Sequence, residues 1–327
     1  MICLSLRTAS LAALVAFSLP AIVAPAQQNV PPAPAAEPAA PAPAAAPVFP
    51  PLDPANFTAS SPTKETVNGF LQASWGYDQT RVWEVAGIFK TSVDGISKVV
   101  IYVGDKTGKQ KTSGIQFFAL ADGKHIIAGD EILPFGDHPY ADNRALIKQQ
   151  ADGPYRGAAD KDFLIVEFAD FQCPHCKDAQ ANMEKLATDF PKARIVYQNY
   201  PLPQHKEAAG AAAYGVCVAK QGGSSAFYTF AAAVFDGQDG LASPDGATLT
   251  LNSAVTKAGL DPVKIAACAK TPATVAEVDA SVKLAKDLGV NQTPTLLVNG
   301  RQVPANAPYD TIKQIVEYQE KLDGLSN

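Results

Sequence analysis

The chain has 327 residues, which is enough for two domains of ordinary size. Hydrophobic residues make up 47% of it and charged residues 18%, a globular composition that excludes a chain disordered throughout. The net charge of −5 excludes the strongly basic surface that nucleic acid or an anionic membrane would require. We therefore predict no nucleic-acid partner.

Residues 1–26 have the pattern of a secretory signal peptide. Arg7 precedes a short apolar run, and Ala-Pro-Ala at 24–26 supplies the small residues of a cleavage site. We predict that this segment is removed together with Cys3; an uncleaved anchor is the alternative. Export predicts an oxidising compartment, in which disulfides form and persist.

Residues 27–60 form a predicted linker. Between 31 and 54 it contains 10 prolines and 9 alanines, a composition that cannot build a core. Because proline keeps the backbone extended, we interpret it as a semi-rigid spacer, with simple disorder as the alternative.

Residues 61–138 are predicted to form a small α+β domain. A helix begins with Ser61 as its N-cap, and three strand-like runs follow, the last with an Asp-Gly hairpin signal at 122–123. We interpret His125 and His138 as surface residues.

A connecting helix and linker are predicted over 139–159, followed by a second domain over 160–327. Its first strand, "DFLIVEF" at 162–168, is a continuous apolar run typical of a buried strand. A helix with one apolar stripe, a second strand, a helical insertion over about 205–285, a strand and a closing helix follow. This order predicts an α/β fold with a small mixed sheet covered by helices.

The sequence Cys173-Pro174-His175-Cys176 lies between the first strand of this domain and its first helix. Cys173 is predicted at the N-cap, where unpaired N–H groups and the helix dipole stabilise a thiolate. A cationic His175 would add to this effect. We therefore predict Cys173 as the exposed attacking sulfur and Cys176, one turn further, as the resolving sulfur.

Two other interpretations of this pair are a structural bridge and a zinc site. A disulfide across three residues constrains the unfolded chain very little. Zinc requires four ligands, and this domain contains only two histidines, His175 and His205, with Cys217 and Cys268 isolated from each other. We predict a redox-active pair, no metal and no other cofactor.

Residues 160–322 resemble the DsbA-like branch of the thioredoxin superfamily, the thiol–disulfide oxidoreductases of the bacterial periplasm. The resemblance is carried by the tetrapeptide at 173–176 and by Glu167, six residues before Cys173. It implies a thioredoxin-like fold with a helical insertion. It also implies that Glu167 is buried and exchanges a proton with the thiol of Cys176. A strand carboxylate facing water is the alternative for Glu167.

Thr293-Pro294, in "NQTPTLLVNGR", matches the second signature of the same family. The resemblance implies a cis bond before Pro294 that turns the backbone toward Cys173. Thr293 would then hydrogen-bond an incoming substrate chain as an added strand.

Cys217 and Cys268 both lie in the predicted helical insertion. A bridge between them would close a loop of about 50 residues, worth roughly 4 kcal/mol by chain entropy. We favour this structural disulfide because of the predicted compartment; two free buried thiols are the alternative.

The domain at 61–138, with the helical linker after it, resembles the N-terminal dimerisation domain of the periplasmic isomerases DsbC and DsbG. The resemblance rests on "LADGKHIIAGDEILPFG" and implies a homodimer with each catalytic domain above a shared cleft. Thr293 before the proline also suits the isomerases.

Three functions follow from these resemblances. We favour an oxidase of the periplasm that donates its disulfide to exported proteins with cysteines and is re-oxidised by a quinone-linked membrane protein. The first alternative is a dimeric isomerase or reductase kept reduced by a membrane reductant. The second is a chaperone-type binding module in which the thiols are incidental.

Overall fold

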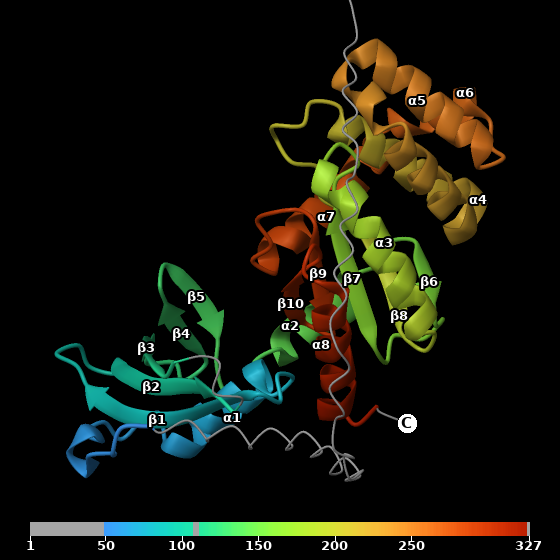
Figure 1. Ribbon diagram of the computed structural model, residues 1–327. Coiled ribbons are helices and arrows are strands. Elements are labelled where there is room, and N and C mark those ends of the chain that lie inside the picture. The colour runs from blue at the N-terminus through green and yellow to red at the C-terminus, as the bar shows by residue number, and fades with distance from the viewer. Residues whose placement is uncertain (1–48, 107–110, 326–327) are drawn as a thin grey trace, which may run out of the picture. The chain divides into compact units, whose positions relative to one another are not determined.

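The structure is a computed structural model that describes residues 49–106 and 111–325. The predicted signal peptide at 1–26 and most of the predicted linker at 27–60 lie outside the described residues. Two sheets, each with its own helices, organise the described chain (Figure 1).

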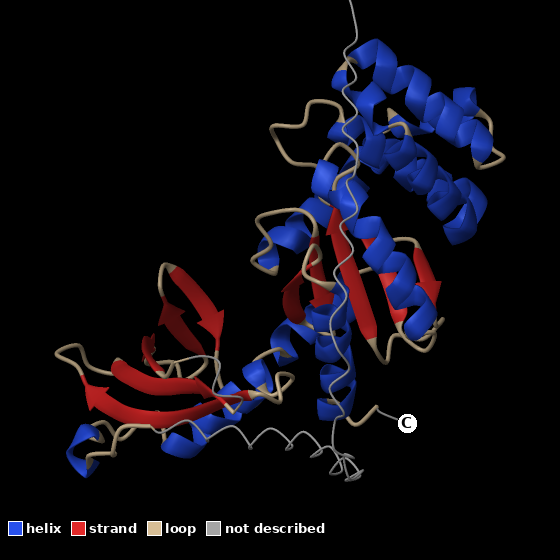
Figure 2. Ribbon diagram, in the orientation of Figure 1, coloured by secondary structure: helices blue, strands red, loops and turns tan. Residues whose placement is uncertain are grey.

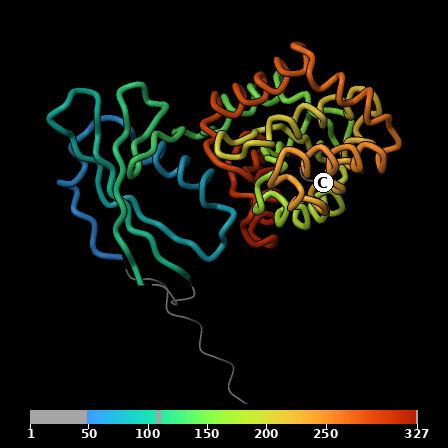
Figure 3. The backbone as a smooth tube through the Cα atoms, turned by 90° about the horizontal axis from the view of Figure 1, so that it is seen from above, coloured from blue at the N-terminus to red at the C-terminus, as the bar shows by residue number. Residues whose placement is uncertain are grey.

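The first sheet has five strands in the order β1-β2-β3-β4-β5, and every neighbouring pair is antiparallel. In Figure 3 its backbone runs back and forth in hairpins. Buried residues of α1, such as Leu71, pack against strand residues such as Val85 and Ile101 in one core. The elements of this part are η1 (Pro54–Asn56), α1 (Lys64–Trp75), β1 (Arg81–Lys90), β2 (Ser97–Asp105), β3 (Ser113–Ala119), β4 (His125–Ala128) and β5 (Glu131–Pro134).

Helix α1 begins two residues later than the sequence predicted. Its N-cap is Thr63 and not Ser61, because the Thr63 hydroxyl accepts a hydrogen bond from the Thr66 backbone N–H at 3.2 Å. Serine and threonine are both good N-cap residues. In this helix the hydroxyl of Thr63 makes the capping hydrogen bond.

The predicted hairpin at 122–123 joins β3 to β4. Gly123 takes the positive φ of +67° that its turn requires, and Phe118 pairs with Ile127 across the hairpin. His125 lies in β4 beside Asp122, with 2.6 Å between its Nδ1 and the carboxylate, and His138 is exposed.

The second sheet has the order β10-β9-β7-β8-β6, in which β7 and β8 are parallel and all other pairs antiparallel. All six residues of the central strand β7 are buried, as the continuous apolar run predicted. The elements of this sheet and its flanking helices are α2 (Ala141–Gln150), β6 (Tyr155–Gly157), β7 (Leu164–Ala169), α3 (Pro174–Asp189), β8 (Arg194–Asn199), α7 (Pro272–Asp287), β9 (Thr295–Val298), β10 (Arg301–Pro304) and α8 (Tyr309–Leu322).

Helices cover both faces of this sheet (Figure 2). Met183 of α3 and Ile312 of α8 share a core with Ile165 on one face. Ile147 of α2 and Leu284 of α7 pack on the other. This three-layer arrangement confirms the predicted fold class, an α/β thioredoxin-like fold.

The helical insertion consists of α4 (Ala208–Asp236), η2 (Gln238–Ala242), α5 (Pro244–Lys257) and α6 (Pro262–Ala269), and α7 leads back to the sheet. Helix α4 is kinked at Gly223, whose φ of +73° interrupts the helical backbone. In Figure 1, α4, α5 and α6 lie together beyond one end of β7.

Residues before 160, the predicted start of the second domain, also contribute to the second sheet and its core. Strand β6 pairs with β8 through Arg156 and Ile195, and α2 contributes Ile147 to the core of the second sheet. The sequence did not indicate this because β6 has only three residues. It ends at Gly157, where an added Cβ would lie 2.1 Å from the Ala193 carbonyl oxygen.

Candidate redox-active site

The two cysteines of the tetrapeptide lie at the start of α3, directly after the end of β7. Cys173 is the N-cap residue with an extended backbone, and Pro174 occupies the first helical position. Proline suits this position because its missing N–H would have no partner there. The Cys176 N–H donates to the Cys173 carbonyl oxygen at 3.1 Å, which closes the first turn.

Hydrogen bonds lower the pKa of Cys173 to about 5. The largest contribution is the hydrogen bond from the Cys176 thiol, and the backbone N–H groups of Cys176 and His175 add to it. Burial acts in the opposite direction but is outweighed. The ordinary pKa of cysteine is about 8.5, so Cys173 is a thiolate at neutral pH.

The prediction that Cys173 is exposed is wrong, since only 4% of it is accessible. The Thr293 carbonyl oxygen lies 3.6 Å from its sulfur, and the Gln238 side chain donates to its carbonyl oxygen at 2.9 Å. The approach of the Thr293 loop was an expectation from the family resemblance, whereas nothing in the sequence indicated the contact with Gln238.

Thr293 and Pro294 are joined by a cis peptide bond. The loop they form precedes β9 and lies against Cys173 through the carbonyl contact already described. The Thr293 hydroxyl is buried, and it acts to lower the pKa of both Cys173 and Cys176.

Cys176 is fully buried, and its pKa is raised, chiefly by burial and next by its hydrogen bond to Cys173. The Asp170 N–H donates to its sulfur at 3.4 Å and acts in the opposite direction. The two sulfurs are free in this structure and differ sharply: the outer one ionises easily and the inner one with difficulty.

The side chain of His175 points into solvent, with 71% of it exposed and Asp178 3.9 Å away. The contribution of His175 to the Cys173 thiolate comes from its backbone N–H.

Glu167 lies in the centre of β7 and is 1% exposed. Burial raises its pKa to about 7, against the lowering effects of Arg156 and of a hydrogen bond from Gln180. The Gln180 amide donates to the Glu167 carboxylate at 3.0 Å and to the Cys176 carbonyl oxygen at 3.0 Å. Gln180 therefore connects the buried acid to the turn that carries the inner sulfur.

Gln180 was missed by the sequence analysis. The available signal was its spacing, because it lies four residues after Cys176 and so on the same face of α3. Arg156 was missed because β6 was not predicted. Its guanidinium lies 4.6 Å from the ring centre of Tyr228 on α4.

The helical insertion is hydrogen-bonded to the loop before Cys173. Gln238 of η2 donates to the Phe171 carbonyl oxygen at 2.8 Å as well as to that of Cys173. Gln172 donates to the Leu241 carbonyl oxygen at 2.9 Å and accepts from the Glu207 N–H at 2.9 Å. These bonds fix the backbone on which the outer cysteine is placed.

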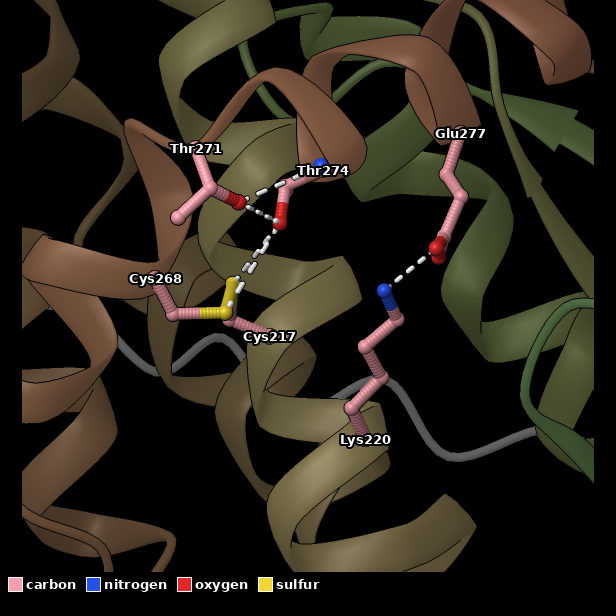
Figure 4. Close-up of a disulfide and its surroundings, with 6 residues drawn as sticks. All are labelled: Cys217, Lys220, Cys268, Thr271, Thr274 and Glu277. Atoms are coloured by element: carbon pink, nitrogen blue, oxygen red, sulfur yellow. Dashed lines mark hydrogen bonds and ion pairs between the residues drawn. A yellow bond between two sulfur atoms is a disulfide. The ribbon is translucent and has the colours of Figure 1, made fainter.

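Cys217 of α4 and Cys268 of α6 form a disulfide, with Cα atoms 6.0 Å apart and a sequence separation of 51 (Figure 4). The hydroxyl of Thr274 on α7 lies 3.5 and 3.7 Å from the two sulfurs. An ion pair between Lys220 and Glu277 also joins α4 to α7. The bridge therefore holds the insertion together at a junction of three helices.

The described residues contain no group of three or more His, Cys, Asp or Glu side chains arranged to hold a metal ion. In the described part of the chain, no helix combines the length and the apolar character needed to cross a membrane.

The fold and the dithiol at the start of α3 define a thioredoxin-like disulfide oxidoreductase domain. A family model described as thioredoxin matches residues 149–318, more than half of the chain. The chain therefore belongs to the thioredoxin family, which confirms the resemblance that the sequence indicated for its second domain.

Among curated proteins, the chain is similar to the Na(+)/H(+) antiporter NhaA of Herminiimonas arsenicoxydans, with 28% identity over 163 residues. It is also similar to the Na(+)/H(+) antiporter NhaA 1 of Mycolicibacterium vanbaalenii, with 30% identity over 164 residues. Each match covers about half of this chain, 50% and 49%, but only 25% of the relative.

Solved structures similar to the chain include Proteus mirabilis ScsC in a transitional conformation, at 23% identity and a TM-score of 0.47, covering 56% of this chain and 79% of that one. A thioredoxin-like oxidoreductase from Silicibacter pomeroyi DSS-3 matches at 25% identity and 0.47, covering 54% and 98%. Pseudomonas aeruginosa DsbA2 matches at 24% and 0.44, covering 51% and 94%.

Proposed function

We propose that this protein is a periplasmic oxidase that introduces disulfides into exported proteins through Cys173 and Cys176. The observation that carries the proposal is the pKa of Cys173, lowered to about 5 by hydrogen bonds at the start of α3. A stable outer thiolate favours the reduced form of the pair, so the disulfide form is a strong oxidant.

The reaction begins with the Cys173–Cys176 disulfide. A substrate thiolate attacks the Cys173 sulfur, a mixed disulfide forms, and Cys176 leaves with the electron pair and gains a proton. Glu167, whose pKa is about 7, is the buried acid proposed to supply that proton, and Gln180 holds it beside the turn of Cys176.

A second substrate thiolate then attacks the substrate sulfur of the mixed disulfide. The substrate leaves with its own disulfide, and Cys173 leaves as a thiolate that the N–H groups of α3 stabilise. Two electrons have passed from substrate to protein. A quinone-linked membrane protein that accepts these electrons would complete the cycle.

Thr293 is proposed to bind the substrate chain. Its loop lies against Cys173, and its hydroxyl is buried. A substrate backbone placed along this loop would bring its cysteine to the outer sulfur. The proposed periplasmic location rests on the signal-peptide pattern of residues 1–26.

An isomerase is the second candidate, because the first sheet, which has its own core, belongs to the part that resembles the dimerisation domain of the isomerases. That sheet is the part proposed to form a homodimer. An isomerase needs the dithiol form, so the two functions differ in the reduction potential of Cys173 and Cys176 and in oligomeric state.

The deciding experiment equilibrates the protein with glutathione and measures the fraction of oxidised Cys173–Cys176. An oxidase should be half reduced near −120 mV, and a thioredoxin-like reductant near −270 mV. A value at the reducing end would contradict the oxidase. Replacement of both cysteines by serine distinguishes an enzyme from a chaperone. A chaperone would retain its full folding activity on a client protein without cysteines.

A further inference from the structure

The side chain of Asp170, three residues before Cys173, is completely buried. Its Oδ1 accepts from the Gln172 N–H at 2.7 Å, and its Oδ2 accepts from the Leu202 N–H at 2.8 Å. His205 Nδ1 lies 2.7 Å from the same Oδ2. With its proton on Nδ1, His205 can donate to this carboxylate oxygen.

The backbone of Asp170 contacts both cysteines. Its carbonyl oxygen accepts from the Cys173 N–H at 3.1 Å, and its N–H donates to the Cys176 sulfur at 3.4 Å. The side chain ties this residue to the segment before α4, through Leu202 and His205. The direction of the Asp170 N–H toward the inner sulfur therefore depends on the bonds that its carboxylate makes.

We propose that Asp170 and His205 are positioning residues for the inner sulfur, which hold the Asp170 N–H on Cys176 and so promote its attack on a mixed disulfide. The proposal rests on the proposed function, because it concerns one step of thiol–disulfide exchange.

In this step the reduced protein exchanges its dithiol with a peptide disulfide. The Cys173 thiolate attacks one peptide sulfur, the S–S bond breaks, and one peptide thiolate leaves. The Cys176 thiol then passes its proton to the Glu167 carboxylate, the Cys176 thiolate attacks the Cys173 sulfur, and the second peptide thiolate leaves. Two electrons have passed from the protein to the peptide disulfide.

The Asp170 N–H matters most in the second half of this sequence. Cys173 opposes ionisation of Cys176 in the free dithiol, both by its hydrogen bond and by its charge. In the mixed disulfide the Cys173 sulfur carries no charge, so both effects disappear. Burial then remains as the opposing cause, and the Asp170 N–H is the leading group that favours the Cys176 thiolate.

The experiment uses the full reduced protein and a fluorescent peptide disulfide, with acid quenching at intervals and mass spectrometry. The two rates measured are formation and resolution of the mixed disulfide. His205→Ala should slow resolution about tenfold, the effect of one lost hydrogen bond, and leave formation within about twofold of the wild type. His205→Asn places an amide N–H near the position of Nδ1 and should restore most of the rate.

Gln204→Ala is the matched control, because Gln204 is exposed in the same loop and should change neither rate. Asp170→Asn carries the same expectation as His205→Ala and replaces it if that variant does not fold. Equal resolution rates in wild type and His205→Ala would overturn the proposal, as would an equal fall in both rates. A wild type whose oxidised form accepts no electrons from a peptide dithiol would instead contradict the proposed function.

Discussion

The chain contains two pairs of cysteines whose surroundings are opposite. Cys173 and Cys176 are three residues apart at the start of a helix, and both are free in the structure. Cys217 and Cys268 are 51 residues apart, joined in a disulfide between two helices. The two pairs differ in loop length and in local hydrogen bonding, the two properties on which their expected roles rest.

Loop length determines what a bridge contributes to stability. Closing 51 residues removes much conformational freedom from the unfolded chain, whereas closing three removes little. Hydrogen bonding determines reactivity, and the N–H groups at the start of α3 stabilise the Cys173 thiolate. The second pair should therefore resist exchange while the first undergoes it.

The largest expected effect is on the rate of thiol–disulfide exchange, for which only the first pair should matter. Cys173→Ser should reduce the rate of exchange with a peptide disulfide by roughly a thousandfold or more, because no other sulfur among the described residues is both ionised and placed to attack. Cys217→Ser/Cys268→Ser, measured where it is folded, should exchange at close to the wild-type rate. Comparable losses in both variants would mean that the assignment of roles is wrong.

For stability, the second pair of cysteines should matter more than the first. Cys217→Ala/Cys268→Ala should lower the free energy of unfolding by about 4 kcal/mol in denaturant titrations. Cys173→Ala/Cys176→Ala should change it far less than that. If the first double variant is as stable as the wild type, the bridge does not hold the insertion.

The burial of Glu167 beside the first pair should make the free energy of unfolding depend on pH. Its pKa is raised from 4.5 to about 7, so its contribution to stability is present below pH 4.5 and lost as the pH rises through about 7. Glu167→Gln should raise the free energy of unfolding by about 2 kcal/mol at pH 8 and have little effect at pH 4. Glu184→Gln, exposed on α3, is the control. A stabilisation independent of pH would argue against a buried acid.

The smallest expected effect concerns the two sulfurs themselves. The Cys176 thiol is the leading cause of the low Cys173 pKa, so Cys176→Ala should move that pKa upward. It should stay below the value of free cysteine, because the His175 N–H and the N–H of residue 176 remain. Thiolate absorbance of the variant measures the change, and an unchanged pKa would show that the helix acts alone.

Local features of the site were predictable from the sequence. Pro174 after Cys173 indicated the helix start, and the apolar run around Glu167 indicated a buried strand. The signals were strong because helix capping and strand burial depend on neighbours along the chain.

Features that depend on distant segments were not predictable. The burial of Cys173 arises from Thr293 and Gln238, which lie 120 and 65 residues away in sequence. The pairing of Asp170 with His205 spans 35 residues, and His205 entered the sequence analysis only as a possible zinc ligand. The Thr293-Pro294 signature indicated the approach of Thr293, but no periodicity or motif encodes the approaches of Gln238 and His205.

The central claim is that Cys173 is a thiolate at neutral pH. Titration of the reduced protein by thiolate absorbance, with Cys217–Cys268 intact, tests it directly. One sulfur should ionise with a midpoint near pH 5, and Cys173→Ser should abolish the corresponding rise in thiolate absorbance. Ionisation that begins only near the ordinary pKa of cysteine, about 8.5, would contradict it.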